Sequence, residues 1–346
     1  MTSSSSPLQL RPGEWVVVRS KEEILATLGP DGAHKNLPFM SEMLRYCGQR
    51  FQVYKRADKT CDTVDKGGGL RMRDTVHLIG TRCEGTAHGG CEAGCFLFWR
   101  EAWLKRADGD ADDVAPSNTT ATAKCTERDL ERAGVVDAAA QVYRCQATQL
   151  LTYTEPLQWW DLRQYVRDVV TNRQPIGEMI GAVLFSAYRK LVDFGIGYRV
   201  LIGLYDWVAA RCGAKPYPIR TGRCEKTPTA ILDLQPGELV RVKPYHEILA
   251  TLDRNSRNRG LWFDAEMVRY CGGTYRVVKR VRRILDEKTG KMLSFSNPCI
   301  VLHDVYCRAT KTKYRLFCPR SNLTYWREIW LERAPEGGAV AQRSTA

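Results

Sequence analysis

The chain has 346 residues, enough for one large domain or for about two to three ordinary ones. Hydrophobic residues make up 44% of it, which suffices for a buried core, and no long apolar run predicts a membrane span. The N-terminus has no basic start followed by an apolar stretch, so we expect no secretory signal and a cytoplasmic location. There the thirteen cysteines would be reduced, which favours metal ligands over disulfides.

The first module of the chain, residues 13–107, returns as residues 237–334. The first copy opens with GEWVVVRSKEEILATLG and the second with GELVRVKPYHEILATLD, at an offset of 224 residues that also aligns Cys83 with Cys307. Near the end, FWREAWLKRA matches YWREIWLERA at an offset of 227. Because the matches recur in the same order along both segments, they indicate a duplicated module.

Each copy predicts short antiparallel strands, because β-branched and aromatic residues alternate with polar ones in WVVVR, FQVYKR, TVHLIG and REAWL and in their counterparts. SKEEILATL is the one short helical insertion. The order of a Gly-x-x-Val-x-Val strand, a turn and a late tryptophan strand resembles SH3-like barrels such as the one in the β-subunit of nitrile hydratase. The resemblance implies a fold and no catalytic residue. We therefore predict a mainly β protein with two homologous SH3-like barrels separated by a helical segment.

Different material lies between the copies. Residues 108–123 are acidic and rich in alanine and predict a solvated linker, and residues 124–235 predict a helical insert. The insert begins with TERDLERAG, where Thr126 opens a capping box and a glycine ends the helix. Further helices are predicted for WWDLRQYVRDVV, from Trp159, and for two longer apolar segments that each end at a glycine.

The densest group of metal ligands is RCEGTAHGGCEAGC in the first copy. Cys83, Cys91 and Cys95 would form a four-thiolate site with Cys61, or a site of three thiolates and one imidazole with His88. The glycines of HGGC let the backbone wrap closely around an ion. We expect zinc or iron, as a metal ion or an iron–sulfur cluster, although the spacing matches no common zinc ribbon or cluster motif. The alternative is small cysteines that pack a barrel.

The second copy has a different set, Cys299, Cys307 and Cys318, and its fourth ligand would come from Cys271, from His303 or from the insert. The two copies thus share a scaffold and differ in their ligands. We expect the first copy to bind metal more tightly and the basic second copy to bind anions more strongly.

The insert adds two sets of candidates. Cys145, in VYRCQAT, is its best candidate for completing a metal site. In WWDLRQYVRD, helical spacing places Asp161 and Tyr165 on one face and Arg163 in another row. We take these three residues as catalytic candidates of a pocket near the barrel–insert junction. The alternative is an amphipathic helix whose tryptophans lie in the core and whose charges pair with one another.

The excess of basic residues is uneven, since residues 236–346 hold +10 of the net charge of +13. This charge suits nucleic acid or another polyanion, or a solvated strand face. The chain also resembles uncharacterised bacterial proteins whose paired modules end in Trp-Arg-Glu-x-Trp-Leu and which are encoded near exopolysaccharide or other biosynthetic genes. We therefore expect a metal-dependent protein of a biosynthetic pathway with a small-molecule or anionic substrate. The alternative is a metal-stapled scaffold that binds nucleic acid, another polyanion or a protein.

Overall fold

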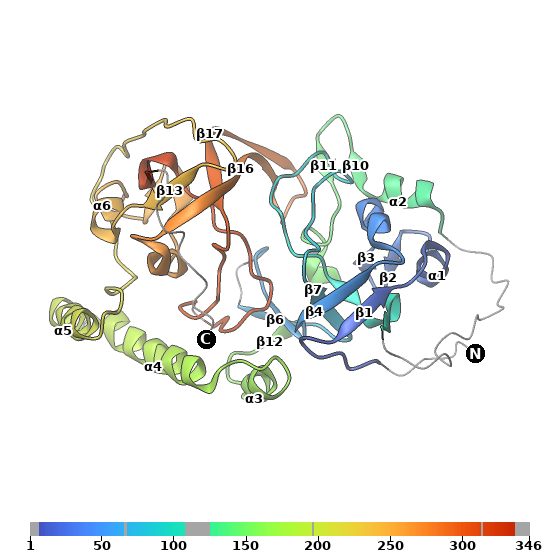
Figure 1. Ribbon diagram of the computed structural model, residues 1–346, viewed down its shortest axis with the longest axis horizontal. Helices are drawn as coiled ribbons and strands as arrows, with labels where there is room; N and C mark the ends of the chain where they lie inside the picture. Colours follow the sequence, from blue (N-terminus) through green and yellow to red (C-terminus); the bar gives the residue numbers. More distant parts are fainter. Residues whose placement is uncertain (1–6, 66–67, 108–124, 196, 313, 336–346) are drawn as a thin grey trace. The chain divides into compact units, whose positions relative to one another are not determined.

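The computed structural model describes residues 7–65, 68–107, 125–195, 197–312 and 314–335 (Figure 1). The predicted linker, 108–123, lies outside them. The chain divides into two compact units. Unit 1 comprises Met1–Gln174, Arg283–Ser294 and Phe317–Arg320, and unit 2 comprises Pro175–Arg282, Phe295–Leu316 and Ser321–Ala346.

Unit 1 is built on an antiparallel sheet with the strand order β8-β7-β4-β1-β9. Figure 1 shows three of these strands side by side, β1, β4 and β7. In β1 the side chains alternate, so that Val16 and Val18 are buried and Trp15 is exposed. The strands are β1 (Trp15–Val18), β4 (Arg50–Arg56), β7 (Thr75–Leu78), β8 (Trp99–Arg100) and β9 (Leu104–Arg106).

The predicted strand REAWL is interrupted by a 3-10 turn, Glu101–Trp103, between β8 and β9. The turn points the Glu101 carboxylate inward, where it accepts hydrogen bonds from the backbone N–H groups of Gln9 and Leu10. The predicted continuous strand, with side chains on alternating faces, is therefore broken at this point, because Glu101 turns inward to give these two backbone amides a hydrogen-bond acceptor.

Smaller elements surround this sheet in unit 1. The helix α1 (Lys21–Thr27) has the capping box formed by Ser20 and Glu23, and a 3-10 helix, Ser41–Tyr46, follows it. Three further strand groups complete the β structure of the unit: a sheet with the order β12-β6-β5 and the pairs β2-β3 and β10-β11. These strands are β2 (Ala33–His34), β3 (Leu37–Pro38), β5 (Lys59–Cys61), β6 (Gly69–Arg71), β10 (Val135–Asp137), β11 (Val142–Tyr143) and β12 (Glu155–Leu157).

The first helices of the insert also belong to unit 1. The predicted capping box is confirmed in α2 (Glu127–Ala133), where the Thr126 side chain accepts from the backbone N–H of Asp129. The helix predicted from Trp159 begins later, as α3 (Arg163–Val170), because the Asp161 carboxylate binds the Arg163 backbone N–H and holds the preceding residues in a turn.

Unit 2 contains a second antiparallel sheet, with the order β17-β16-β13-β18. Its pairing repeats that of the first sheet, since Val240 opposes Tyr275 as Val16 opposes Phe51. The strands of this sheet are β13 (Leu239–Val242), β16 (Thr274–Leu285), β17 (Met292–Leu302) and β18 (Leu331–Arg333), and the end of β16 and the start of β17 fall in the segment Arg283–Ser294 of unit 1. A separate pair is formed by β14 (Arg257–Asn258) and β15 (Leu261–Trp262). The helices are α4 (Ile176–Asp193), α5 (Tyr198–Arg211) and α6 (Tyr245–Leu249).

The cores of the two sheets use the same aromatic arrangement. In unit 1 the buried Trp103 packs edge-to-face on Phe39 at a centroid distance of 5.1 Å, and its indole N–H donates to the Thr27 hydroxyl. In unit 2 Trp330 packs on Phe263 at 5.2 Å in the same way. Each of these tryptophans is fully buried, so each anchors its sheet to the preceding segment.

The fold is therefore mainly antiparallel β sheet with helices, as predicted. Among the described residues each main sheet has two end strands, so closure into a barrel stays a prediction. Within the same residues, no helix combines the length and the apolar content that a bilayer crossing needs.

Candidate metal centre

Two short arms of unit 1 bring Cys83 and Cys95 face to face. The Cys83 backbone N–H donates to the Cys95 carbonyl oxygen at 2.8 Å, and Arg82 and Phe96 form an antiparallel bridge beside them. This ladder is why two cysteines that are twelve positions apart in sequence lie opposite each other.

The loop between these arms is closed by glycine. Gly85 has a φ of +79°, and a Cβ at this position would lie 2.0 Å from the Cys91 carbonyl oxygen. The Gly85 carbonyl in turn accepts hydrogen bonds from the backbone N–H groups of His88 and Gly90, at 3.1 and 2.8 Å. The loop can therefore fold this tightly only with glycine at position 85, and the turn keeps His88 and Cys91 close to the arms.

The insert is docked onto these arms by Gln146, which is 4% exposed. Its side-chain oxygen accepts from the Phe98 backbone N–H at 2.9 Å, and its side-chain nitrogen donates to the carbonyl oxygens of Phe98 and Pro38, each at 3.0 Å. The neighbouring Cys145 is held by its backbone N–H, which donates to the Thr148 hydroxyl. These bonds fix Cys145 beside the first copy of the repeat.

A cavity of about 30 Å³ within unit 1 is lined by five soft or borderline metal ligands, and we call it the thiol cavity. It is large enough to hold a water molecule or an ion. No disulfide involves any of the thirteen cysteines, all of which lie in the described part of the chain. The five ligands are Cys83, His88, Cys91, Cys95 and Cys145.

Burial favours the uncharged forms of four of these ligands. Burial raises the pKa of Cys95 to about 11 and that of Cys145 to about 12, and it raises the pKa of Cys83 as well. It lowers the pKa of His88, whose Nδ1 is buried and has no hydrogen-bond partner in the described structure. A thiol that costs free energy to ionise and an imidazole with an unpartnered nitrogen are both stabilised by a bound cation, so these residues fit a metal.

One trio in this region has its ligand atoms within 4.8 Å of one another, namely Glu42, Cys83 and His88. Among the described residues no other trio of His, Cys, Asp and Glu is as compact. Two of these atoms, Cys83 Sγ and His88 Nε2, are separated by 3.4 Å. The remaining thiols share the cavity at greater distances, so a four-ligand site would require small movements of these side chains.

The role of Glu42 becomes clear from the second copy. Its carboxylate accepts from the Thr86 hydroxyl at 3.1 Å, and in unit 2 the matching Glu266 accepts from the Thr310 hydroxyl at 3.3 Å. Since this clasp exists in both copies, Glu42 primarily holds its loop. At the offset of 224 the position of His88 is occupied by Thr312, which is a poor metal ligand.

A buried ion pair also borders the thiol cavity. Arg320 is 1% exposed, and its guanidinium binds the Glu287 carboxylate at 3.0 Å and the Thr63 hydroxyl at 2.7 Å. Its charge partly offsets the effect of burial on the Cys95 thiol. A guanidinium at this point favours thiolate over thiol and so supports negative ligands.

Several predicted ligands lie outside the thiol cavity. In unit 1, Cys61 is held by its backbone N–H, which donates to the Cys318 sulfur at 3.1 Å. In unit 2, Cys299 accepts from the Arg327 guanidinium at 3.6 Å, and Cys307 lies in the same unit. The set predicted for the second copy is therefore divided, because Cys318 belongs to unit 1.

Each catalytic candidate of the insert is held by a nearby partner. The Asp161 carboxylate binds Arg163 and Arg71, each at 2.8 Å, and the bond to Arg163 lowers the pKa of Asp161 to about 2. The Tyr165 hydroxyl donates to the Trp159 carbonyl oxygen. Asp161 is thus a permanently ionised partner of two arginines, which suits structure better than acid–base chemistry.

The tryptophans of this helix do not lie in the core, contrary to the alternative considered above. Trp159 is 40% exposed and Trp160 is 60% exposed. The turn that delays the start of α3 places both residues before the helix, so helical periodicity does not govern them.

The residues missed by sequence reasoning are Glu42, Gln146, Glu287 and Arg320. Glu42 had a usable signal, because both copies carry glutamate at that position, in FMSEM and FDAEM. The other three carry no local motif. Comparison of the chain with protein families, with curated proteins and with solved structures found no match.

Proposed function

We propose that this protein binds one zinc or iron ion in the thiol cavity, through Cys83, Cys91 and Cys95 with either Cys145 or His88 as the fourth ligand. The observation that carries the proposal is the convergence of four thiols and one imidazole on a single ion-sized cavity of unit 1. The buried, unpartnered Nδ1 of His88 supports it further, because a buried polar atom without a partner costs free energy that a bound ion would remove. We take the ion to be mononuclear, because the four thiols and the imidazole surround a single small cavity.

The size of the cavity favours a structural ion. A catalytic metal needs an open coordination position that a substrate can reach, whereas the five protein ligands around this small cavity are enough to complete the coordination of one ion. Such an ion would hold the glycine-rich loop against the arms and against the insert. Loss of the ion would then loosen this part of unit 1, since the binding free energy of a structural metal is also folding free energy.

Metal analysis tests this proposal. Anaerobically purified protein should contain about one zinc or iron per chain, and iron would add visible absorption that zinc lacks. Substitution of Cys91→Ser should lower the metal content, and Cys145→Ser should lower it if Cys145 is the fourth ligand. Cys212→Ser should leave it unchanged, because Cys212 is exposed on unit 2. Full metal content in Cys91→Ser, or protein that never contains metal, would contradict the proposal.

We also propose that the two repeats are diverged copies of one SH3-like barrel module and that only the first retains the metal. The repeated strand register and the repeated glutamate clasp support a common module. The threonine at the position of His88 supports the loss of metal from the second copy. A stoichiometry of two ions per chain, or loss of metal in Cys307→Ser, would contradict this divergence.

A role in a biosynthetic pathway with a small anionic substrate extends the proposal, and it rests on the resemblance described above. The alternative function, a scaffold for nucleic acid or another polyanion, is favoured by the charge of +10 in residues 236–346. Binding to heparin or RNA separates the two functions. Tight binding that weakens steeply with salt would favour the scaffold, and weak binding at physiological salt would favour the small-molecule role.

A further inference from the structure

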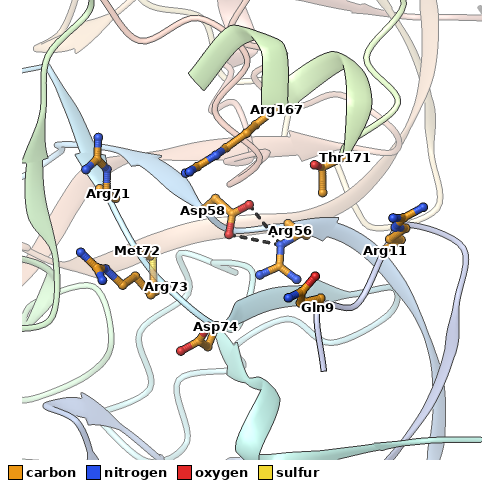
Figure 2. Close-up of a pocket in the computed structure, with 10 residues that line it drawn as sticks. All are labelled: Gln9, Arg11, Arg56, Asp58, Arg71, Met72, Arg73, Asp74, Arg167 and Thr171. Carbon is orange, nitrogen blue, oxygen red and sulfur yellow. Dashed lines mark hydrogen bonds and ion pairs between the residues drawn. The ribbon is translucent and has the colours of Figure 1, made fainter. Parts of the chain in front are cut away.

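A second, larger pocket of unit 1 has walls of arginine, and we call it the arginine pocket. Its volume is about 510 Å³, which lies within the range of small-molecule sites. Figure 2 shows its side chains around one hollow, with Arg167 and Thr171 extending from the α3 region and Arg71 and Arg73 on another side. Five arginines and two aspartates line it, namely Arg11, Arg56, Arg71, Arg73 and Arg167 with Asp58 and Asp74.

The charges of this pocket are only partly neutralised. Three of the five arginines have a carboxylate partner. Arg56 binds Asp58 at 3.1 Å and Glu101 at 2.6 Å. Arg71 binds Asp161 at 2.8 Å, and Arg73 lies 3.8 Å from Glu155. In the described part of the chain no carboxylate forms an ion pair with Arg11 or Arg167, and both side chains are exposed to solvent. A concave surface with such a cationic excess attracts and concentrates anions.

The second copy has a carboxylate at a position that is neutral in the arginine pocket. In unit 2, Glu328 holds the backbone N–H groups of residues 232–234, as Glu101 holds the matching segment in unit 1. There the Asp233 carboxylate pairs with Arg280. In unit 1 the residue at the position of Asp233 is Gln9, which is neutral and lines the arginine pocket.

Gln9 keeps the strained backbone of its counterpart without the charge. Its φ is 50°, and that of Asp233 is also 50°. The left-handed conformation therefore accompanies the glutamate clasp in both copies. In unit 1 the matching arginine, Arg56, pairs with Asp58 and Glu101. The cationic charge left for a negative ligand is that of Arg11 and Arg167, for which the described chain supplies no carboxylate.

We infer that the arginine pocket binds a small phosphorylated molecule. The guanidinium fork matches phosphate oxygens in pairs, which makes arginine the preferred residue for such groups. The Thr171 hydroxyl and the Gln9 amide add neutral hydrogen-bonding groups to the walls. No aromatic ring lines the pocket, so recognition depends on charge and hydrogen bonds, as for a sugar phosphate or a diphosphate, and not on stacking with a base.

This inference does not depend on the metal. Titration calorimetry of the full-length protein with pyrophosphate should show saturable binding that weakens with salt. The double substitution of Arg11→Gln and Arg167→Gln should weaken the binding by about tenfold or more, since each removed guanidinium loses charge-assisted hydrogen bonds. The matched control is Arg128→Gln, an exposed arginine on α2 that does not line the pocket.

The outcomes separate the sources of phosphate. Pyrophosphate binding that the double variant loses and Arg128→Gln keeps would support the inference, provided that the circular dichroism spectrum is unchanged. Absence of saturable pyrophosphate binding, or equal weakening in the control, would overturn it. Binding of a single-stranded oligonucleotide in the absence of pyrophosphate binding would also overturn it, because the ligand would then be a nucleic-acid backbone.

Discussion

Metal binding to the thiol cavity should release a defined number of protons, and this number identifies the ligands. The pKa values of Cys83, Cys95 and Cys145 are all raised by burial, the latter two to about 11 and about 12. In the metal-free protein at neutral pH these three groups are therefore thiols. Each of them that becomes a thiolate ligand must release about one proton. The pKa of His88 is lowered, so its imidazole binds metal without releasing any.

The sign of the pH dependence follows directly. If these three cysteines bind the ion, each rise of one pH unit should tighten binding by roughly 1,000-fold, with a further factor of about ten if Cys91 also enters as a thiol. If His88 and not Cys145 is the fourth ligand, metal binding would release about one proton fewer.

The assay is calorimetric titration of the metal-free protein in buffers of different ionisation enthalpy, repeated with Cys145→Ser. The variant should release about one proton less than the parent protein if Cys145 is a ligand. Cys212→Ser serves as the control, because its exposed thiol lies in unit 2 and should leave the count unchanged. A release of fewer than about one proton would show that thiols are not the ligands.

Three further predictions concern stability. Asp168→Asn should lower the free energy of unfolding by about 3 kcal/mol or more in denaturant titration, because it leaves the buried Lys59 ammonium unpaired. The double variant Lys59→Met with Asp168→Leu should recover most of that loss. Gly85→Ala should lower the free energy of unfolding more than Gly48→Ala. Both glycines have a positive φ, but of the two only position 85 lacks space for a Cβ. Equal losses would show that the contact with Cys91 does not matter. Burial lowers the pKa of His77 from 6.5 to about 3, so the unfolded chain takes up a proton first as the pH falls. Below about pH 6.5 the free energy of unfolding should thus fall by up to about 1.4 kcal/mol per pH unit. His77→Gln should reduce that slope, and an unchanged slope would contradict the prediction.

Local patterns predicted the elements whose cause is local. The capping box at Thr126 and the two apolar segments that became α4 and α5 were all recognisable, because caps and periodicity act within a few residues. The interruption of REAWL was not recognisable. It depends on Glu101 meeting the amides of Gln9 and Leu10, which are more than ninety positions away.

The sequence by itself identified the cysteine-rich loop, the duplicated order of strands and the candidate Cys145, since residue types and repeats are visible without coordinates. Only the tertiary structure separated Cys61 and Cys318 from the thiol cavity and placed Arg320 beside it. It also formed the arginine pocket from segments that carry no shared motif. The physical reason is that a site depends on which side chains meet when distant segments pack, and that packing is decided by burial and hydrogen bonding over the whole unit.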